Sequence, residues 1–261
     1  MLEAVILGIV EGVTEFLPIS STGHLLILEQ WLTRRSDLFN IAIQAGTILA
    51  VTFVYRERLV ELLRRWREPV HRDYLLKLVG AFVVTGVLGL AAKLAGVELP
   101  ETATPIVWTL IIGGVVIFIA EYYARHHVPA ERVTWLVVAA VGVAQVVAGV
   151  LPGTSRSGAA IFAAMFAGLT MRSRAAEFAF LVGIPTMFAA TGYELLSTLT
   201  DASAAGAERW GELAVAFVVA AVTGFIAVKW LIGFIATHTF VVFAWYRIAL
   251  GLALLLLIGM G

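Results

Sequence analysis

Long apolar stretches separated by short polar connections dominate the chain. About 20 apolar residues cross the hydrocarbon of a bilayer as a helix, so the longest stretches are expected to be spanning helices. They are Ile41 to Tyr55, Leu75 to Ala95, Pro105 to Tyr123, Phe178 to Leu199, Leu213 to Ile235 and Phe240 to Met260. Pro185 interrupts one of them, which membrane helices tolerate when neighbours satisfy the freed carbonyl. The pattern predicts an all-α integral membrane protein.

Two further apolar segments, Leu2 to Leu32 and Val133 to Leu169, do not fit a simple span. Each is broken near its middle by a polar cluster that contains proline and glycine. Each half is too short to cross the membrane comfortably, because a helix rises only about 1.5 Å per residue. We therefore expect both segments to form re-entrant helical hairpins.

The two hairpin segments also resemble each other. Gly8 to Ile27 aligns without gaps on Gly142 to Ile161. In this alignment Leu17, Pro18 and Ser21 fall on Leu151, Pro152 and Ser155, and Glu11 falls on Gln145. Chance similarity between two apolar segments is the alternative, but the breaks coincide. The prediction is a single membrane domain over residues 1–261, with repeat one at about 1–123 and repeat two at about 133–261, each a hairpin plus three spanning helices.

The positions of the basic residues predict the orientation, because cytoplasmic loops are enriched in lysine and arginine. The connection after the first span holds six arginines: Arg56, Arg58, Arg64, Arg65, Arg67 and Arg72. With that connection inside, both termini are external, the first hairpin enters from outside and the second from the cytoplasm. The two repeats then have inverted topology. Arg34 and Arg35 would then lie on the external side, against the enrichment of basic residues in cytoplasmic loops, but the six arginines of the other connection outnumber them.

Composition supports a membrane location and excludes several classes of function. The chain is 61% apolar and 14% charged, against about 45–50% and 25% in soluble domains, and its mean hydropathy is +0.95. Its formal charge is zero, so no nucleic-acid partner is expected. Absence of cysteine excludes disulfides, thiolate metal sites and a cysteine nucleophile. A secretory signal peptide begins with basic residues, whereas this chain has Glu3, so the first residues are expected to form the first helix of the protein.

The first hairpin carries two carboxylates on one helical face. Glu11 and Glu15 are four residues apart, one turn of a helix. A charge at the centre of a bilayer costs about 2.5–3.5 kcal/mol even on the lenient insertion scale, so two need a compensating role. A metal-binding or proton-transferring pair is the interpretation; hydrated side chains at the interface are the alternative.

The break of the first hairpin offers hydroxyls and a histidine. Pro18 ends the first half, and Ser20, Ser21 and Thr22 lie at the expected start of the second, where free N–H groups and the helix dipole favour a phosphate. Simple capping explains one hydroxyl, not three. His24 follows one turn later and is expected to face back toward the break, although a lone histidine is often structural. The candidate phosphate-binding residues here are Ser20, Thr22 and Gly23.

The second hairpin supplies the sequence PGTSRSG, Pro152 to Gly158. Glycine lets backbone approach a ligand closely, and Arg156 offers a charged planar fork that matches phosphate oxygens. An arginine exposed in a cytoplasmic loop is the alternative, but long apolar runs flank the break. The candidate phosphate-binding residues here are Gly153, Thr154, Ser155 and Ser157.

Together the hairpins predict two half-helix N-termini that meet near the bilayer midplane around one polar cavity. Broken helices arranged in this way are familiar from transporters of anionic substrates. A carboxylate pair, a histidine, hydroxyls and an arginine are also the groups that phosphoryl transfer requires. A lipid or ion transporter and a phosphatase are therefore the two functional hypotheses.

The motifs resemble those of a known family. EGVTEFLPISSTGH (Glu11 to His24) and PGTSRSG are similar to the two signature motifs of the bacterial undecaprenyl-pyrophosphate phosphatases, integral-membrane enzymes associated with bacitracin resistance. The resemblance extends to IQAGTILAV, EFAFLVGIP and WYRIALG and so covers essentially the whole chain. Ala160 stands where the family often has threonine. SSTGH also resembles the PSGH motif of soluble acid phosphatases, but the other motifs of those enzymes are missing.

The resemblance implies hydrolysis of undecaprenyl diphosphate to the monophosphate, which recycles the cell-wall carrier lipid. It implies a divalent cation, Mg²⁺ or Ca²⁺, held by Glu11 and Glu15, a bacterial cytoplasmic-membrane location, a site that opens to the external or periplasmic side and, as one option, a homodimer. The catalytic residues it implies are Glu11, Glu15, Ser21, His24 and Arg156. Whether Ser21, His24 or an activated water attacks phosphorus is left open.

Overall fold

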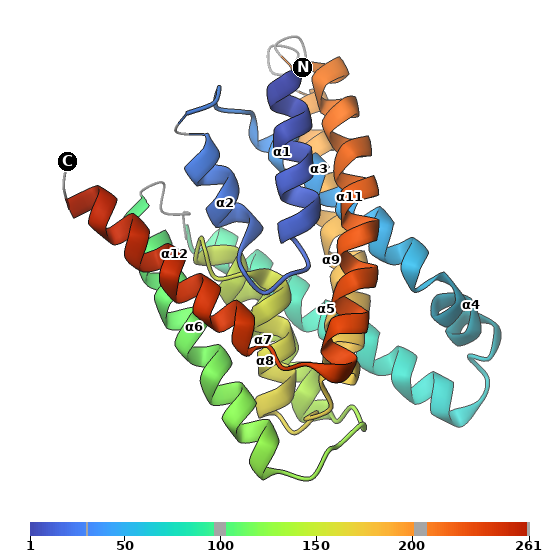
Figure 1. Ribbon diagram of the computed structural model, residues 1–261. Helices are drawn as coiled ribbons and strands as arrows, with labels where there is room; N and C mark the ends of the chain where they lie inside the picture. Colours follow the sequence, from blue (N-terminus) through green and yellow to red (C-terminus); the bar gives the residue numbers. More distant parts are fainter. Residues whose placement is uncertain (30, 97–102, 201–207, 260–261) are drawn as a thin grey trace.

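The computed structural model describes residues 1–29, 31–96, 103–200 and 208–259 of the chain, and in these residues every regular element is a helix (Figure 1). The helices are α1 (Leu2–Thr14), α2 (Ser21–Leu28), α3 (Asp37–Val54), α4 (Arg56–Arg64), α5 (Pro69–Leu94), α6 (Ala103–His126), α7 (Trp135–Val150), α8 (Arg156–Phe166), α9 (Arg172–Thr200), α11 (Trp210–Thr237) and α12 (Val241–Gly259).

All six stretches predicted to span the membrane are helical. Within the described part of the chain, five helices are long and apolar enough to cross a bilayer, namely α3, α5, α6, α9 and α11. The sixth, α12, has a shorter apolar stretch, Val241–Leu256, and Met260 lies outside the described residues. Pro185 lies inside the continuous helix α9, as expected for a membrane helix. The fold is therefore an all-helical, multi-pass membrane protein.

The arginine-rich connection after the first span is not a simple loop. It contains α4, which follows α3 with only Tyr55 between them. Most residues of RERLVELLR favour helix, and Arg58 pairs with Glu61 one turn later at 2.8 Å. This helix was not predicted, because its sequence is too short and too charged to span a membrane.

Two pairs of short helices lie where the hairpins were predicted, and their open ends point in opposite directions. Figure 1 shows α1 descending from the upper side and α2 returning to it, whereas α7 rises from the lower side and α8 returns there. The two tips meet near the middle of the molecule, where α8 lies between α7, α9 and α6.

The second halves of the two hairpins begin in the same way. Ser20 (φ 75°) and Ser155 (φ 65°) precede α2 and α8, and their hydroxyls accept the N–H groups of Gly23 at 3.1 Å and Gly158 at 3.2 Å. The structure therefore pairs Ser155 with Ser20, so the gap-free alignment with Ser21 is wrong by one residue beyond the break. The second break contains one more residue between its proline and its capping serine.

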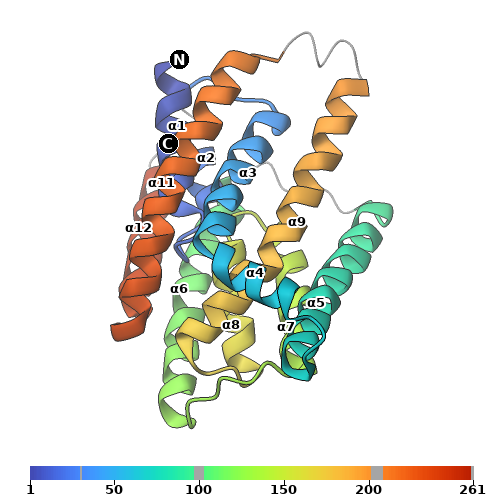
Figure 2. The ribbon, with the colours of Figure 1, turned by 90° about the vertical axis from the view of Figure 1, so that its right-hand side faces the viewer.

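Each hairpin packs against helices from the other half of the chain. α1 lies along α11, and α7 lies along α5, while α6 packs on α12 and α3 on α9 (Figure 2). The contact between α1 and α11 depends on glycine: a Cβ at Gly12 would lie 1.8 Å from Thr223 Oγ1 and 2.7 Å from the Ala220 carbonyl oxygen. The two halves are interlocked, so neither could bury its hairpin alone.

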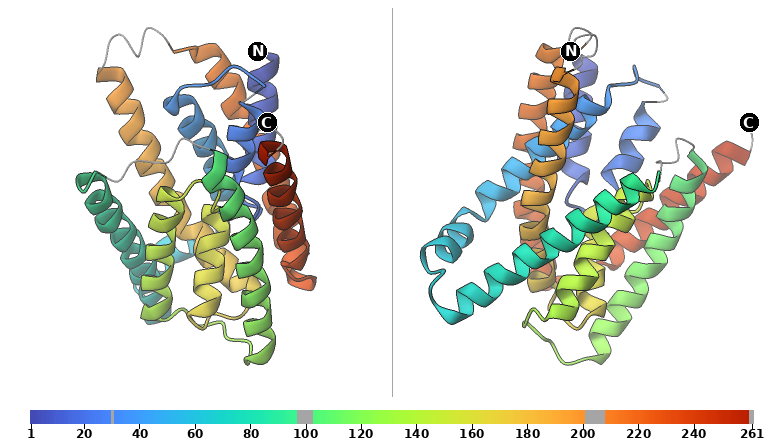
Figure 3. Two further views of the ribbon diagram at one scale, coloured as in Figure 1. Left: turned by 90° about the vertical axis from the view of Figure 1, so that its left-hand side faces the viewer. Right: turned by 180° about the vertical axis from the view of Figure 1, so that it is seen from behind.

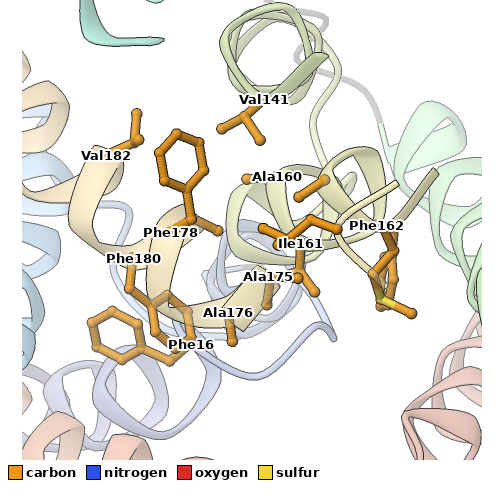
Figure 4. Close-up of a cluster of buried hydrophobic side chains, with 14 of the residues drawn as sticks. Phe16, Val141, Ala160, Ile161, Phe162, Ala175, Ala176, Phe178, Phe180 and Val182 are labelled. Carbon is orange, nitrogen blue, oxygen red and sulfur yellow. The ribbon is translucent and has the colours of Figure 1, made fainter. Parts of the chain in front are cut away.

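The largest apolar cluster supports both tips. Phe16, just before the first break, packs edge-to-face on Phe180 of α9, with ring centroids 5.4 Å apart (Figure 4). Ile161 and Phe162 of α8 lie in the same cluster, together with Val141 of α7. The polar residues at the tips are therefore held on a rigid apolar base.

Candidate active site

The tips of the two hairpins touch. The Ser157 hydroxyl donates to the backbone carbonyl of Glu15 at 2.9 Å. A Cβ at Gly158 would lie 3.1 Å from the Pro18 Cβ. The prediction that the two breaks lie side by side is confirmed.

A buried arginine that the sequence analysis did not single out joins the two breaks. Arg247 of α12 is 1% exposed, and its guanidinium donates only to backbone carbonyls, at 2.6–3.3 Å. The acceptors belong to Pro18, Thr109, Leu110, Gly153 and Thr154. One side chain thus holds both tips and α6 together. The available signal was a charged residue inside a membrane helix, which is costly and therefore functional by default.

The carboxylate pair is buried in the protein and not hydrated at the interface. Glu11 is 0% exposed and Glu15 is 9% exposed. The Ser21 hydroxyl donates a hydrogen bond to Glu15 Oε2. Both Glu11 carboxylate oxygens lack a hydrogen-bond partner among the described residues, although Glu15 and Arg156 are close enough to interact with Glu11 electrostatically. Glu15 is positioned to take a proton from Ser21, whereas Glu11 is available for another ligand.

Arg156 reaches the same place from the second hairpin. Its Nη2 donates to Gln44 Oε1 of α3 at 3.5 Å, a partner that the sequence analysis did not identify. Arg156, Glu15 and Gln145 line one cavity of about 30 Å³. That volume accommodates about one water or one bare cation but no phosphate group.

His24 is held at both ring nitrogens. Nδ1 lies 2.6 Å from the Ser20 carbonyl oxygen, and Nε2 lies 2.7 Å from the Tyr246 hydroxyl. A carbonyl can only accept, so Nδ1 carries a proton, and in the neutral ring Nε2 accepts from Tyr246. His24 faces back toward the break, as predicted, but its observed contacts are with Ser20 and Tyr246 and not with the carboxylate pair. Tyr246 was also missed from sequence.

The candidate phosphate-binding residues fall into two groups. Ser20 and Ser155 use their hydroxyls as helix caps. The Thr154 hydroxyl is buried without a partner in the described structure, and the Thr22 hydroxyl is half-buried with none either. Gly153 (φ 85°) leaves room for the Thr109 hydroxyl, which would lie 2.3 Å from a Cβ. The Thr22 and Thr154 hydroxyls are thus available to an anion at the two helix N-termini, where the helix dipoles also favour negative charge.

The residues present fit a hard divalent cation at the carboxylate pair. Mg²⁺ and Ca²⁺ prefer oxygen ligands, and the unpartnered Glu11 oxygens lie beside Glu15. Gln145 Oε1 is likewise buried and unpartnered. No group of three or more histidine or acidic side chains with metal-binding geometry occurs among the described residues, so such a cation would keep water or phosphate oxygens as further ligands.

Comparison with known proteins places these features in one family. The family described as bacitracin resistance protein BacA matches residues 4–253. A protein of Rhizobium etli strain CIAT 652 named undecaprenyl-diphosphatase is 60% identical over 254 residues, which cover 97% of this chain and 96% of that protein. A protein of the same name from Xanthomonas axonopodis pv. citri strain 306 is 57% identical over 256 residues, 98% of this chain and 96% of that protein.

Proposed function

Because this chain belongs to the bacitracin resistance protein BacA family, we propose that it is a membrane phosphatase that hydrolyses undecaprenyl diphosphate to the monophosphate and inorganic phosphate. The observation that carries the proposal is the buried Ser21–Glu15 hydrogen bond facing Arg156 across the two touching tips. A hydroxyl, a base and a permanent positive charge converge there, as phosphoryl transfer requires.

The geometry favours Ser21 as the nucleophile. Its hydroxyl proton already points at Glu15, whereas both nitrogens of His24 are engaged. Ser21 Oγ attacks the terminal phosphorus, Glu15 takes the proton, and the bond to the bridging oxygen breaks, so that undecaprenyl monophosphate leaves. Water then attacks the phosphoserine, phosphate departs, and Ser21 Oγ regains its proton from Glu15. Arg156 and the N-termini of α2 and α8 stabilise the charge on the transferring phosphoryl oxygens.

Glu11 and Glu15 would hold the divalent cation, with Gln145 as a further oxygen donor. The cation supplies charge neutralisation to the diphosphate oxygens when it is bound. Without it, the buried carboxylate pair would repel an anionic substrate.

Two inverted repeats account for the architecture. In support, the hairpins enter from opposite sides, Ser20 and Ser155 share a rare positive-φ capping geometry, and α1 packs on α11 as α7 packs on α5. The arginine-rich connection lies on the side from which the second hairpin enters (Figure 3). This chain is then a protein of the bacterial cytoplasmic membrane whose first hairpin opens to the external side. Because it lacks cysteine, a single cysteine near Arg65 can be labelled selectively; labelling by an impermeant reagent outside intact cells would reverse this orientation.

Phosphate release from undecaprenyl diphosphate by the purified protein tests the function. Ser21→Ala should lower the rate by more than about 10³, up to about 10⁶, and should abolish acid-stable radiolabel transferred from the terminal phosphate to the protein. Ser20→Ala is the matched control, because it removes a neighbouring hydroxyl that caps α2 and should cost about 1 kcal/mol of stability while leaving the label intact. A protein that moves the lipid across vesicles without releasing phosphate would favour the transporter.

A further inference from the structure

Residues 56–72, here called the elbow, stand apart from the helical bundle. α3 runs almost directly into α4, and the chain then turns into α5. Figure 1 and the right-hand panel of Figure 3 show this corner projecting sideways from the other helices. Leu62 is the buried residue of α4, and every residue from 63 to 70 is exposed. The elbow therefore presents most of its side chains outward.

One part of this exposed surface is apolar. Val60 and Leu63 of α4 are 44% and 66% exposed, and Trp66 and Val70 beyond it are 52% and 77% exposed. Because α3 is a spanning helix, this surface lies where the span leaves the bilayer. Apolar side chains and tryptophan at that level suit the boundary between head groups and acyl chains.

The rest of the elbow carries positive charge that the protein does not neutralise. It has six arginines against three glutamates. Arg58 is paired with Glu61 and Glu177, and hydrogen bonds from Arg65 hold the pKa of Glu68 below its usual range. The arginines without a carboxylate partner among the described residues are Arg64, Arg67 and Arg72. They are exposed and free to bind an outside anion.

The charged and apolar groups meet in a shallow groove on α4. The groove has a volume of about 490 Å³, and Arg56, Val60 and Arg64 follow one another in its lining at four-residue intervals along one helix face. Its other lining residues are Glu57, Glu61 and Arg65. Glu57 pairs with Arg56 and Glu61 with Arg65, so Arg64 is the guanidinium of the groove that has no carboxylate partner among the described residues. Guanidinium groups on either side of an aliphatic side chain match a phosphodiester that continues into acyl chains.

We propose that the elbow is a binding surface for the head groups of anionic phospholipids such as phosphatidylglycerol. The positive charge of the elbow fits an anionic occupant, and its position at the end of a span, with exposed apolar side chains beside it, favours a lipid over an acidic protein. Each arginine near an anionic surface strengthens binding by about fivefold, and salt weakens the attraction. The proposal does not depend on the catalytic mechanism, since no elbow residue lines the cavity between the hairpin tips.

Lipid binding to the purified full-length protein tests this surface. Native mass spectrometry would compare titrations with phosphatidylglycerol and phosphatidylcholine for wild type, for Arg64→Gln and for the control Arg125→Gln. The control removes the same charge from an exposed arginine at the end of α6 that lines neither of the pockets at the elbow. We expect wild type to prefer phosphatidylglycerol, the elbow variant to bind it roughly fivefold more weakly, and the control to stay close to wild type. Thermal unfolding in a zwitterionic detergent should be unchanged in both variants.

A second measurement locates the surface directly. Leu63→Cys, labelled with an environment-sensitive fluorophore, should shift to the blue in phosphatidylglycerol vesicles more than in phosphatidylcholine vesicles, whereas Val128→Cys in the connection before α7 should not. Equal losses in the two arginine variants would show that any positive charge on this side suffices and would overturn the proposal. Absence of a preference for phosphatidylglycerol in wild type would also overturn it and would leave the elbow to a protein partner.

Discussion

Replacing Arg247 should separate the two hairpin tips. Its guanidinium is the shared donor to carbonyls in both breaks and in α6. Arg247→Met keeps much of the side-chain volume but leaves five carbonyl acceptors without this donor. The change tests whether the tips are held together by this side chain or by the apolar packing beneath them.

The expected loss follows from the number and kind of bonds. A hydrogen bond to a charged group contributes about 1.5–3 kcal/mol net, but removing the buried charge also removes its desolvation cost. The balance is a loss of about 1–3 kcal/mol in the free energy of unfolding, because the substitution leaves buried neutral carbonyls without this donor but leaves no unpaired charge. Displacement of a reacting group by about 1 Å costs about 10² in rate, so phosphate release should fall at least that far.

Gly113 provides an independent way to move the same guanidinium. A Cβ at Gly113 would lie 2.1 Å from Arg247 Nη2 and 2.5 Å from its Cζ, so Gly113→Ala must push the group out of place. Gly86 in α5 is the matched control, because a Cβ there meets nothing within 4 Å. Gly86→Ala should be neutral or stabilise the helix by about 0.5–1 kcal/mol.

Phosphate release and thermal unfolding of the purified variants decide the matter. Arg247→Met and Gly113→Ala should both lose activity, and Gly86→Ala should not. If Gly113→Ala released phosphate at the rate of Gly86→Ala, the position of the guanidinium would not matter for the site. If Arg247→Met were as active as wild type, the apolar cluster alone would be sufficient to align the tips.

Three further variants probe the site. Chelation of divalent cations should abolish phosphate release. Glu11→Gln should raise the cation concentration that gives half-maximal thermal stabilisation by about tenfold or more. If that concentration were unchanged, Glu11 would not be part of the cation site. Tyr246→Phe deletes the donor to His24 Nε2 and should lower kcat by roughly tenfold with little change in melting temperature. Trp245→Phe is the control; an equal loss of kcat in that variant would show that packing, and not the hydrogen bond, is responsible. Arg156→Lys should lower the rate of phosphate release by about 10²-fold, because an ammonium keeps the charge but not the two-pronged geometry of the guanidinium. A rate near that of wild type would show that the charge alone is sufficient.

The hairpins and their contact could be predicted from sequence because membrane chemistry restricts the options. Polar residues and prolines in the middle of apolar segments, such as Pro18 and Pro152, have few places to go in a bilayer. Two such breaks lower the free-energy cost of burying polar groups when they share one polar region. The hydrogen bond from the Ser157 hydroxyl to the Glu15 carbonyl is an example.

The residues that were missed have a different character. Gln44, Tyr246 and Arg247 lie on spanning helices far in sequence from the residues they contact. Periodicity predicts that such helices exist but not which of their faces meets a given loop. Arg247 was nonetheless detectable as a charge within an apolar stretch, whereas Gln44 and Tyr246 carry no comparable cost.

The one-residue correction at the breaks changes how the duplication should be understood. When Ser20 is matched to Ser155 by their shared capping geometry, Ser21 and Arg156 become equivalent positions, each the first residue of its half-helix. A residue at that position projects beside the free N–H groups that attract phosphate. One of these positions therefore offers a hydroxyl and the other a fixed positive charge. Glu11 and Gln145, which the alignment also matches, differ as a carboxylate and an amide. Under the proposed duplication and mechanism, two equivalent positions thus bring two unlike groups to one phosphate, which a site built from two identical tips could not do.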